Sequence, residues 1–227
     1  MTPVRPTWRS TVLRGAISSL LGVLARRTLS GVENIPRQGP CLLVFNQMSL
    51  FDTPLLSVLV PRRDVTGLVA RDYRRNPVYR LLVECGGGMW IRRATGDRAA
   101  LEAGLAALKR GWVVGISPEG RRSRTGGLVQ GKPGPAFLAR RSGAPIVPVA
   151  FVDTDKLAAA WRRFNRPTIE IRVGEPFRLP GPGGGSRKQH RRDDTDRIMC
   201  HIAALLPPRY RGVYAEHPYL STRSAEG

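Results

Sequence analysis

The stretch CLLVFNQMSLFDTP, residues 41–54, decides how this chain folds. Its first five residues are apolar and predict a short buried strand, and Asn46 follows directly after that strand. The residues Asp52-Thr53-Pro54 suit the first turn of a helix, which the apolar residues that come next would continue. Because a strand, a polar turn and a helix in this order place side chains at the carboxyl edge of a sheet, residues 46–52 are candidates for a functional site.

Strand and helix patterns alternate along the rest of the chain. Apolar or alternating runs predict further strands at 64–70, 89–91, 112–116, 146–152 and 168–173. Helices are predicted at 55–60, 76–84, 99–109, 135–141 and 197–206. Repeated strand-then-helix units are typical of an α/β fold with a largely parallel central sheet flanked by helices. We expect that architecture in one domain spanning residues 31–227.

Two segments depart from this alternation. Residues 12–25 are apolar but are bracketed or interrupted by arginines, and the run is shorter than the ~20 residues that span a bilayer. We interpret residues 1–30 as an amphipathic helix in a membrane interface; a helix packed on the protein's own core is the alternative that the same periodicity allows. Residues 181–192 are rich in Gly, Arg and Lys and predict a mobile loop, and the acidic residues 193–196 would cap the helix that follows.

The chain is strongly basic, with 37 Lys and Arg against 17 Asp and Glu and a formal net charge of +20. Such a charge predicts an anionic neighbour, and nucleic acid and an anionic membrane surface both fit it. We favour the membrane and expect no nucleic acid, because the sequence has no helix-turn-helix, stacking-aromatic or zinc-ligand pattern. An arginine-rich genome is a plainer explanation for part of the excess.

The cysteines and histidines point to no special chemistry. Three scattered cysteines without a CxxC pair argue against a disulfide framework and indicate a reducing compartment. The three histidines, at 190, 201 and 217, are too dispersed to predict a metal site.

Four segments carry a set of motifs: NQMSLFD at 46–52, GMWIRR at 88–93, SPEGRRS at 117–123 and IVPV at 146–149. In order and rough spacing they resemble the four blocks of the glycerolipid acyltransferases, in particular the 1-acyl-sn-glycerol-3-phosphate acyltransferase family. The resemblance implies that family's α/β fold and the transfer of an acyl group to the hydroxyl of lysophosphatidic acid or a related lysophospholipid, giving phosphatidic acid. It further implies an acyl-CoA or acyl carrier protein thioester as acyl donor, no bound cofactor or metal, and a peripheral location at the cytoplasmic face of a membrane.

The first block departs from the family at one position. The family reads Asn-His-x4-Asp, and the resemblance implies that the histidine is a general base which the aspartate orients; here Asp52 is kept, but Gln47 replaces the histidine. A glutamine amide can hydrogen-bond to Asp52 or to a substrate hydroxyl, but it has no proton affinity near neutral pH. Loss of a positioned base lowers a rate by ~10²–10⁴-fold. We therefore expect a weakened acyltransferase. The alternatives are an inactive homologue that binds lipid or a partner, and a substituted position in an otherwise active enzyme.

Arginines of the second and third blocks are the candidate phosphate ligands. Arg93 and Arg122 fall on the family's arginines, so the resemblance implies that they hold the glycerophosphate, with Arg121 as an added ligand. A planar guanidinium grips a phosphate with two charge-assisted hydrogen bonds. The other residues expected to contact substrate are Asn46, Glu119, Gly120 and Lys132.

The fourth block, at 146–149, offers only apolar side chains. It is expected either to line an acyl groove or to be a plain core strand, and the sequence leaves both interpretations open.

Overall fold

The computed structural model describes residues 8–85, 87–91, 98–123, 125–181 and 186–220. In these residues seven strands form one sheet in the order β1-β7-β6-β2-β5-β3-β4. They are β1 (Arg26–Ser30), β2 (Cys41–Phe45), β3 (Val65–Ala70), β4 (Met89–Ile91), β5 (Val113–Ile116), β6 (Ile146–Val152) and β7 (Thr168–Val173). All neighbouring strands are parallel except β6 and β7, which confirms the largely parallel α/β sheet.

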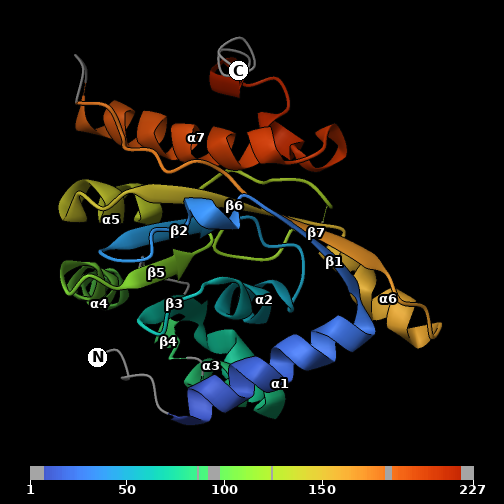
Figure 1. The fold of residues 1–227 in the computed structure, drawn as a ribbon. Coiled ribbons are helices and arrows are strands. Elements are labelled where there is room, and N and C mark those ends of the chain that lie inside the picture. The colour runs from blue at the N-terminus through green and yellow to red at the C-terminus, as the bar shows by residue number, and fades with distance from the viewer. Residues whose placement is uncertain (1–7, 86, 92–97, 124, 182–185, 221–227) are drawn as a thin grey trace.

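Helices cover both faces of the sheet (Figure 1). One face carries α1 (Trp8–Leu24), α2 (Asp52–Leu59), α3 (Pro77–Cys85) and α6 (Leu157–Arg162). The other carries α4 (Arg98–Lys109), α5 (Gly134–Ser142) and α7 (Arg187–Leu205). The chain is thus a three-layer sandwich, and the helices predicted from the sequence are present, with the differences given below.

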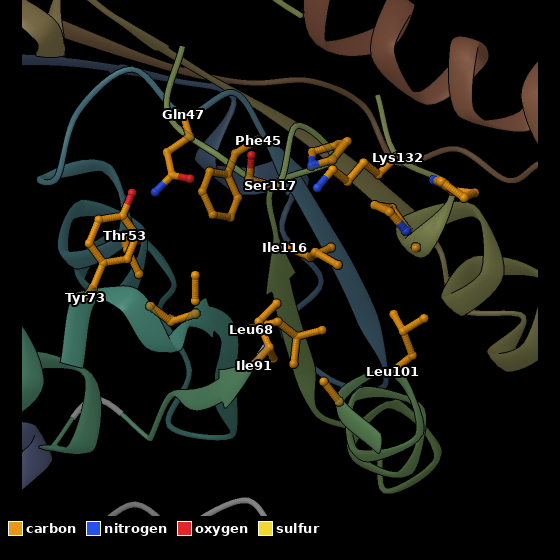
Figure 2. A pocket seen from close by; sticks show the side chains of 18 residues that line it. Phe45, Gln47, Thr53, Leu68, Tyr73, Ile91, Leu101, Ile116, Ser117 and Lys132 are labelled. Carbon is orange, nitrogen blue, oxygen red and sulfur yellow. The ribbon is translucent and has the colours of Figure 1, made fainter. Parts of the chain in front are cut away.

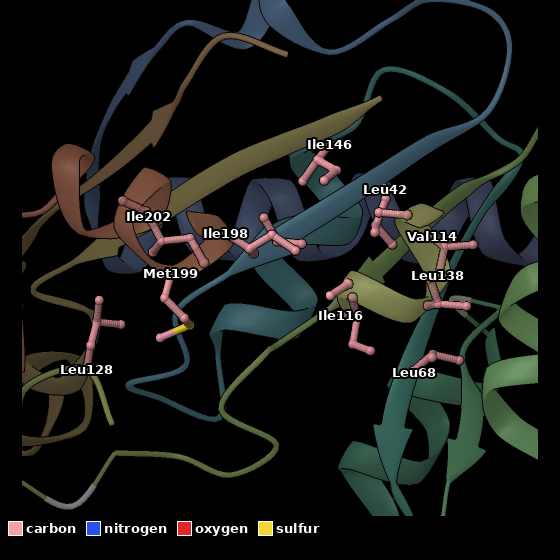
Figure 3. Packing of buried hydrophobic residues seen from close by; sticks show 14 of the residues in the cluster. Leu42, Leu68, Val114, Ile116, Leu128, Leu138, Ile146, Ile198, Met199 and Ile202 are labelled. Carbon is pink, nitrogen blue, oxygen red and sulfur yellow. The ribbon is translucent and has the colours of Figure 1, made fainter. Parts of the chain in front are cut away.

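The central strands are buried from both sides, which explains their unbroken apolar sequences. In β2, Leu42 and Val44 pack with α5 and α7, whereas Leu43 and Phe45 pack with α1 and α2. Figure 3 shows the first of these cores, with Leu42 of β2, Leu138 of α5 and Ile198 of α7 among its side chains. Side chains that alternate between two apolar layers leave only the strand ends for polar residues, so the chemistry of the chain is confined to the sheet edges.

The N-terminal segment is not a single helix. The helix expected over residues 1–30 is present over Trp8–Leu24, but Arg26–Ser30 forms strand β1, parallel to β7. The sequence Arg-Arg-Thr-Leu-Ser gives no apolar signal because β1 lies at an open sheet edge and is largely exposed. Its conformation is fixed by pairing with β7, a partner more than a hundred residues away that no local pattern reveals.

Helix α1 packs on the protein with one side only. Leu21 is buried in the core between α1 and α2, whereas Val12, Leu20 and Val23 are exposed. The described side chains of α1 thus pack on the protein's own core on one side, and its location in a membrane interface stays a prediction. No described helix is long and apolar enough to cross a membrane.

The mobile loop expected at 181–192 is wrong over its second half. Helix α7 already begins at Arg187, and the Ser186 hydroxyl caps it by accepting a hydrogen bond from Gln189 N at 3.2 Å. The acidic residues 193–196 lie within the helix rather than at its start. Polar residues 187–192 carry no helical periodicity, and they are helical because they continue the buried part of α7. Residues 182–185 lie outside the described residues.

One of these acidic residues, Asp194, instead holds α7 to α5. Its two carboxylate oxygens accept hydrogen bonds from Nε and Nη2 of Arg140 at 2.8 and 2.6 Å. The Asp194 side chain is almost completely buried in this pair. Such a two-pronged, partly desolvated ion pair is stronger than a pair in full contact with water.

We predict that Asp194→Ala lowers the free energy of unfolding by about 2 kcal/mol, since it leaves the Arg140 guanidinium without its carboxylate. The neighbouring Asp193, whose hydrogen bond to Gln189 is exposed, provides the matched control. Asp193→Ala should change stability by less than about 0.5 kcal/mol. Urea denaturation of the three proteins measures the difference, and equal stabilities would contradict the assigned role of Asp194.

Candidate active site

The loop between β2 and α2 is fixed at its first residue by Asn46. This side chain is fully buried; its Nδ2 donates to Phe151 O at 2.9 Å, and its Oδ1 accepts from Phe151 N at 2.8 Å. Both polar ends of the amide are therefore used to join the carboxyl end of β2 to β6. The structure places Asn46 as a positioning residue, and its predicted contact with substrate remains a prediction.

Gln47 is held by its main chain rather than by its side chain. Its N–H donates to Glu119 Oε1 at 3.0 Å, and its carbonyl oxygen accepts from Ser123 N at 2.9 Å. The first and third sequence blocks are thereby joined at one residue. The side chain is left to line a cavity beside the loop (Figure 2).

Asp52, the first residue of α2, folds the loop back on itself. Its Oδ2 accepts hydrogen bonds from the N–H groups of Met48 and Ser49 at 2.7 and 2.6 Å. Its Oδ1 is buried and has no hydrogen-bond partner among the described residues, so the expected bond from the Gln47 amide is not formed. A buried, unpartnered carboxylate oxygen is costly, and it lies five residues from the position where the family has histidine.

Burial also sets the charge of Asp52. Removal from water raises the pKa of this carboxyl from 3.8 to about 7; the N–H groups of Ser49 and Met48 oppose the rise, as does the Thr154 hydroxyl. Thr154 lowers the Asp52 pKa only by its proximity: Thr154 Oγ1 and Asp52 Oδ1 both lack a hydrogen bond of normal geometry. Sequence reasoning missed Thr154, which lies just after β6 and outside all four blocks.

Glu119 is a second buried carboxyl group. Besides the Gln47 N–H it accepts a hydrogen bond from Val129 N, to Oε2 at 3.1 Å. Burial raises the pKa of Glu119 to about 7, against the two N–H groups and the nearby charge of Arg121. Both oxygens are occupied by main-chain donors, so Glu119 joins the loop after β2 to the loop after β5, and its predicted contact with substrate stays a prediction.

The cavity beside Gln47 has a volume of about 250 Å³. Figure 2 shows Gln47, Ser117, Tyr73 and Lys132 at one end of it, and Leu68, Ile91, Leu101 and Ile116 toward the other. The cavity is therefore more polar where the loops after β2, β3 and β5 meet, and apolar below. None of the three histidines of the chain lines it, so no imidazole substitutes for the missing base there.

One basic side chain, Lys132, lines the polar end of the cavity, and Arg122 contacts the lining residue Tyr73. Gly120 has a φ of +64°, a conformation that suits glycine, and a Cβ there would lie 3.1 Å from Lys132 Nζ. Lys132 thus lies against the Pro-Glu-Gly turn, and its expected contact with substrate stays a prediction. Arg121 is exposed, and Arg122 is exposed with its Nε donating to Tyr73 Oη at 3.2 Å. The predicted ligand Arg93 lies outside the described residues.

Tyr73 and Ser117 were not singled out by sequence reasoning. Tyr73 comes from the turn at Arg71–Arg75 after β3, a stretch notable in sequence only for its arginines. Ser117 is the first residue of the third block, and its Oγ is buried without a hydrogen-bond partner in the described part of the chain. Tyr73 and Ser117 line the cavity because the loops after β2, β3 and β5 pack together, which the sequence alone does not show.

The fourth block lies in the core. Ile146, Val147 and Val149 are fully buried in β6 and do not line the cavity. Of the two interpretations of this block, the acyl-groove wall is wrong and the core strand is confirmed.

The sequence over this scaffold matches a known family. Residues 26–152, which include β1 to β6 and all four blocks, match the family described as Acyltransferase. The chain belongs to the acyltransferase family. A 1-acyl-sn-glycerol-3-phosphate acyltransferase of Borreliella burgdorferi is 27% identical over 129 residues, which are 56% of this chain and 51% of that protein. A lyso-ornithine lipid O-acyltransferase of Pseudomonas aeruginosa is 32% identical over 167 residues, 65% of this chain and 62% of that protein.

A solved acyltransferase supports the fold. The crystal structure of the 1-acyl-sn-glycerophosphate acyltransferase PlsC from Thermotoga maritima superposes with a TM-score of 0.63 at 23% identity, covering 83% of this chain and 76% of that one. The match confirms the acyltransferase fold. The chain spans only about half the length of the 1-acyl-sn-glycerol-3-phosphate acyltransferases that it matches.

We predict that the buried Asp52 makes stability fall as pH rises. A carboxyl whose pKa is raised by folding binds more protons in the folded than in the unfolded state, so its stabilising contribution is complete below about pH 4 and is lost toward about pH 7. Asp52→Asn should remove this dependence and be more stable than the wild type above pH 7 by at least about 1 kcal/mol. Urea denaturation across this pH range measures it. Asp193→Asn, on a partly exposed carboxylate, serves as control, and parallel curves for wild type and Asp52→Asn would contradict the assignment.

Proposed function

We propose that this chain transfers an acyl group from a thioester to the hydroxyl of lysophosphatidic acid or a related anionic lysolipid, giving phosphatidic acid or its counterpart. The observation that carries the proposal is the cavity at Gln47, which has Lys132 and polar side chains at one end and is apolar below. A lysolipid has the matching shape, because its charged headgroup and its acyl chain are joined at the glycerol that carries the reacting hydroxyl. Family membership and the names of the relatives support the same reaction class.

In this reaction the lysolipid hydroxyl oxygen attacks the thioester carbonyl carbon, the carbon–sulfur bond breaks, and the thiol of coenzyme A or acyl carrier protein leaves. The hydroxyl proton must pass to an acceptor and finally to the leaving sulfur. Gln47 cannot accept it. Asp52 is fully buried, with one oxygen held by two N–H groups, and it is not among the residues that line the cavity. Rate enhancement therefore depends on holding the two substrates together and on the cationic side chains near the cavity. We expect slow turnover.

A second candidate function rests on Gln47 alone. A homologue without a base at this position keeps the cavity and Lys132 at its polar end, and so keeps the means to bind a lysolipid. On this alternative the chain is catalytically silent and holds lipid or a partner. The two candidates differ in whether any thiol is released.

We predict that Gln47→His raises the release of coenzyme A from an acyl-CoA, with lysophosphatidic acid as acceptor, by ~10²–10⁴-fold. An imidazole at this position would supply both a base and a donor for the unpaired Asp52 Oδ1. Gln47→Ala is the matched control and should bring no gain. In the double variant Gln47→His/Asp52→Asn most of the gain should be lost. No turnover by the wild type but turnover by Gln47→His would identify a silenced enzyme; silence in both would refute acyl transfer to this acceptor.

The acceptor is proposed to be recognised by its anionic headgroup through Arg122, Arg121 and Lys132. A phosphate would compete with the Tyr73 hydroxyl for the Arg122 guanidinium. Lyso-ornithine lipid, the acceptor in the name of the Pseudomonas relative, has no phosphate and is the natural comparison.

We predict that Arg122→Gln raises the KM for lysophosphatidic acid about tenfold, because it removes a charge-assisted contact, while the KM for lyso-ornithine lipid changes little. The comparison is best made in the Gln47→His background, where turnover is easiest to measure. Arg110→Gln, on an exposed arginine after α4, is the charge-matched control. An equal increase in KM for both acceptors would show that Arg122 does not bind the phosphate specifically.

We further propose that the chain works as a peripheral protein at an anionic membrane surface on the cytoplasmic side. Its net charge of +20 and the exposed apolar side of α1 support this location.

A further inference from the structure

The end of helix α6 exposes an aromatic ring that no described residue covers. Phe164 is 100% exposed and has a φ of +55°. It ends the helix by donating its N–H to Trp161 O at 3.0 Å, a position that normally holds glycine. A bulky residue is unfavourable in this conformation. A ring that stays in contact with water in the folded state also contributes no hydrophobic free energy to folding. The ring at 164 therefore has no stabilising role within the described residues.

The ring is surrounded by arginines. Residues 162–166, which we call the α6 tip, read Arg-Arg-Phe-Asn-Arg. Arg162 Nε donates to Ala158 O at 3.3 Å, and Arg166 hydrogen-bonds to Gly22 O at the end of α1, so both side chains contact main-chain oxygens rather than carboxylates. The sequence has no Asp or Glu at 157–169 or at 1–32. The α6 tip and α1 therefore carry arginines and no acidic residue.

The α6 tip is attached to α1 and to the active-site loop. Trp161 Nε1 donates to Leu24 O at 2.8 Å, and the Trp161 ring packs edge-on against Phe51 with 4.7 Å between ring centres. Phe51 immediately precedes Asp52. Figure 1 shows α6 beside the C-terminal end of α1, where Leu20 and Val23 are exposed. Exposed apolar groups from two elements thus lie near each other, close to the loop that bears Gln47.

We propose that the α6 tip is a membrane-docking element, with Phe164 inserted at the acyl boundary of an anionic bilayer and its arginines on the lipid headgroups. A bilayer fits better than a protein partner, because the surface is a convex tip with one ring and positive charge, not a groove or a flat apolar patch. Together with the exposed side of α1 it orients the active-site loop toward the lipid. This inference builds on the proposed function for its purpose, but vesicle binding tests it without any acyl transfer.

The test is flotation of the full chain with vesicles of phosphatidylcholine alone and of equal parts phosphatidylcholine and phosphatidylglycerol, without acyl donor or acceptor. Phe164→Gly should weaken binding to the anionic vesicles about tenfold, the order expected for removing a buried phenyl ring. Glycine suits the positive φ, so thermal unfolding should show a fold at least as stable as wild type. Phe164→Trp should bind like the wild type. Phe137→Ala, which truncates a partly exposed ring on α5 at the other end of β6, should bind like the wild type too.

The arginines are tested separately. Arg162→Gln/Arg163→Gln should weaken binding to the anionic vesicles and reduce its sensitivity to salt, because fewer charges contact the headgroups. Equal binding by Phe164→Gly and Phe137→Ala would overturn the proposal, as would a wild type that binds neither vesicle. Self-association that is lost in Phe164→Gly, without vesicle binding, would assign the surface to a second copy of the chain instead.

Discussion

The carboxylate of Glu119 holds together the loops on which the whole site depends. Its two oxygens accept the main-chain N–H groups of Gln47 and Val129, residues from loops that follow β2 and β5. A carboxylate is the side chain best suited to this task, because it offers only acceptors and can satisfy two donors at once. Without it, two N–H groups would be buried and unpaired at the same point, and the cavity would lose the arrangement of its polar end.

The same burial that makes Glu119 useful makes the site electrostatically unusual. Glu119 and Asp52 both have a pKa raised to about 7, since removal from water disfavours their charged forms more than the neighbouring N–H groups favour them. The chain nevertheless carries a large excess of arginine, most of it on the surface. Lys132 at the polar end of the cavity and Arg122 on Tyr73 are the cationic groups placed to hold an anionic headgroup, with room for an uncharged acyl chain in the apolar part beneath.

Sequence patterns predicted the strands that are buried on both faces of the sheet. They failed where the conformation of a segment depends on pairing with a strand far along the chain. The apolar runs of β2 and β6 identified the central strands, and the polar turn after β2 identified the site. Strand β1 was missed because its polar sequence is stabilised only by pairing with β7. The roles of Asn46 and Glu119 could not be read from the sequence either, since a buried acceptor of main-chain N–H groups and a substrate ligand look alike until the fold brings their partners together.

The way Gln47 is held explains how a residue expected to be catalytic can change without loss of the fold. Its main-chain N–H and carbonyl oxygen bind Glu119 and Ser123, and any residue except proline offers the same two groups. Its side chain faces the cavity and is not needed for the loop. Asp52, by contrast, is fixed by its side chain, which the loop needs for two N–H groups. The side chain at position 47 can therefore change without loss of the loop, whereas the side chain at position 52 cannot. The presence of Asp52 thus indicates that the loop is preserved, and it does not indicate that position 47 carries a catalytic base.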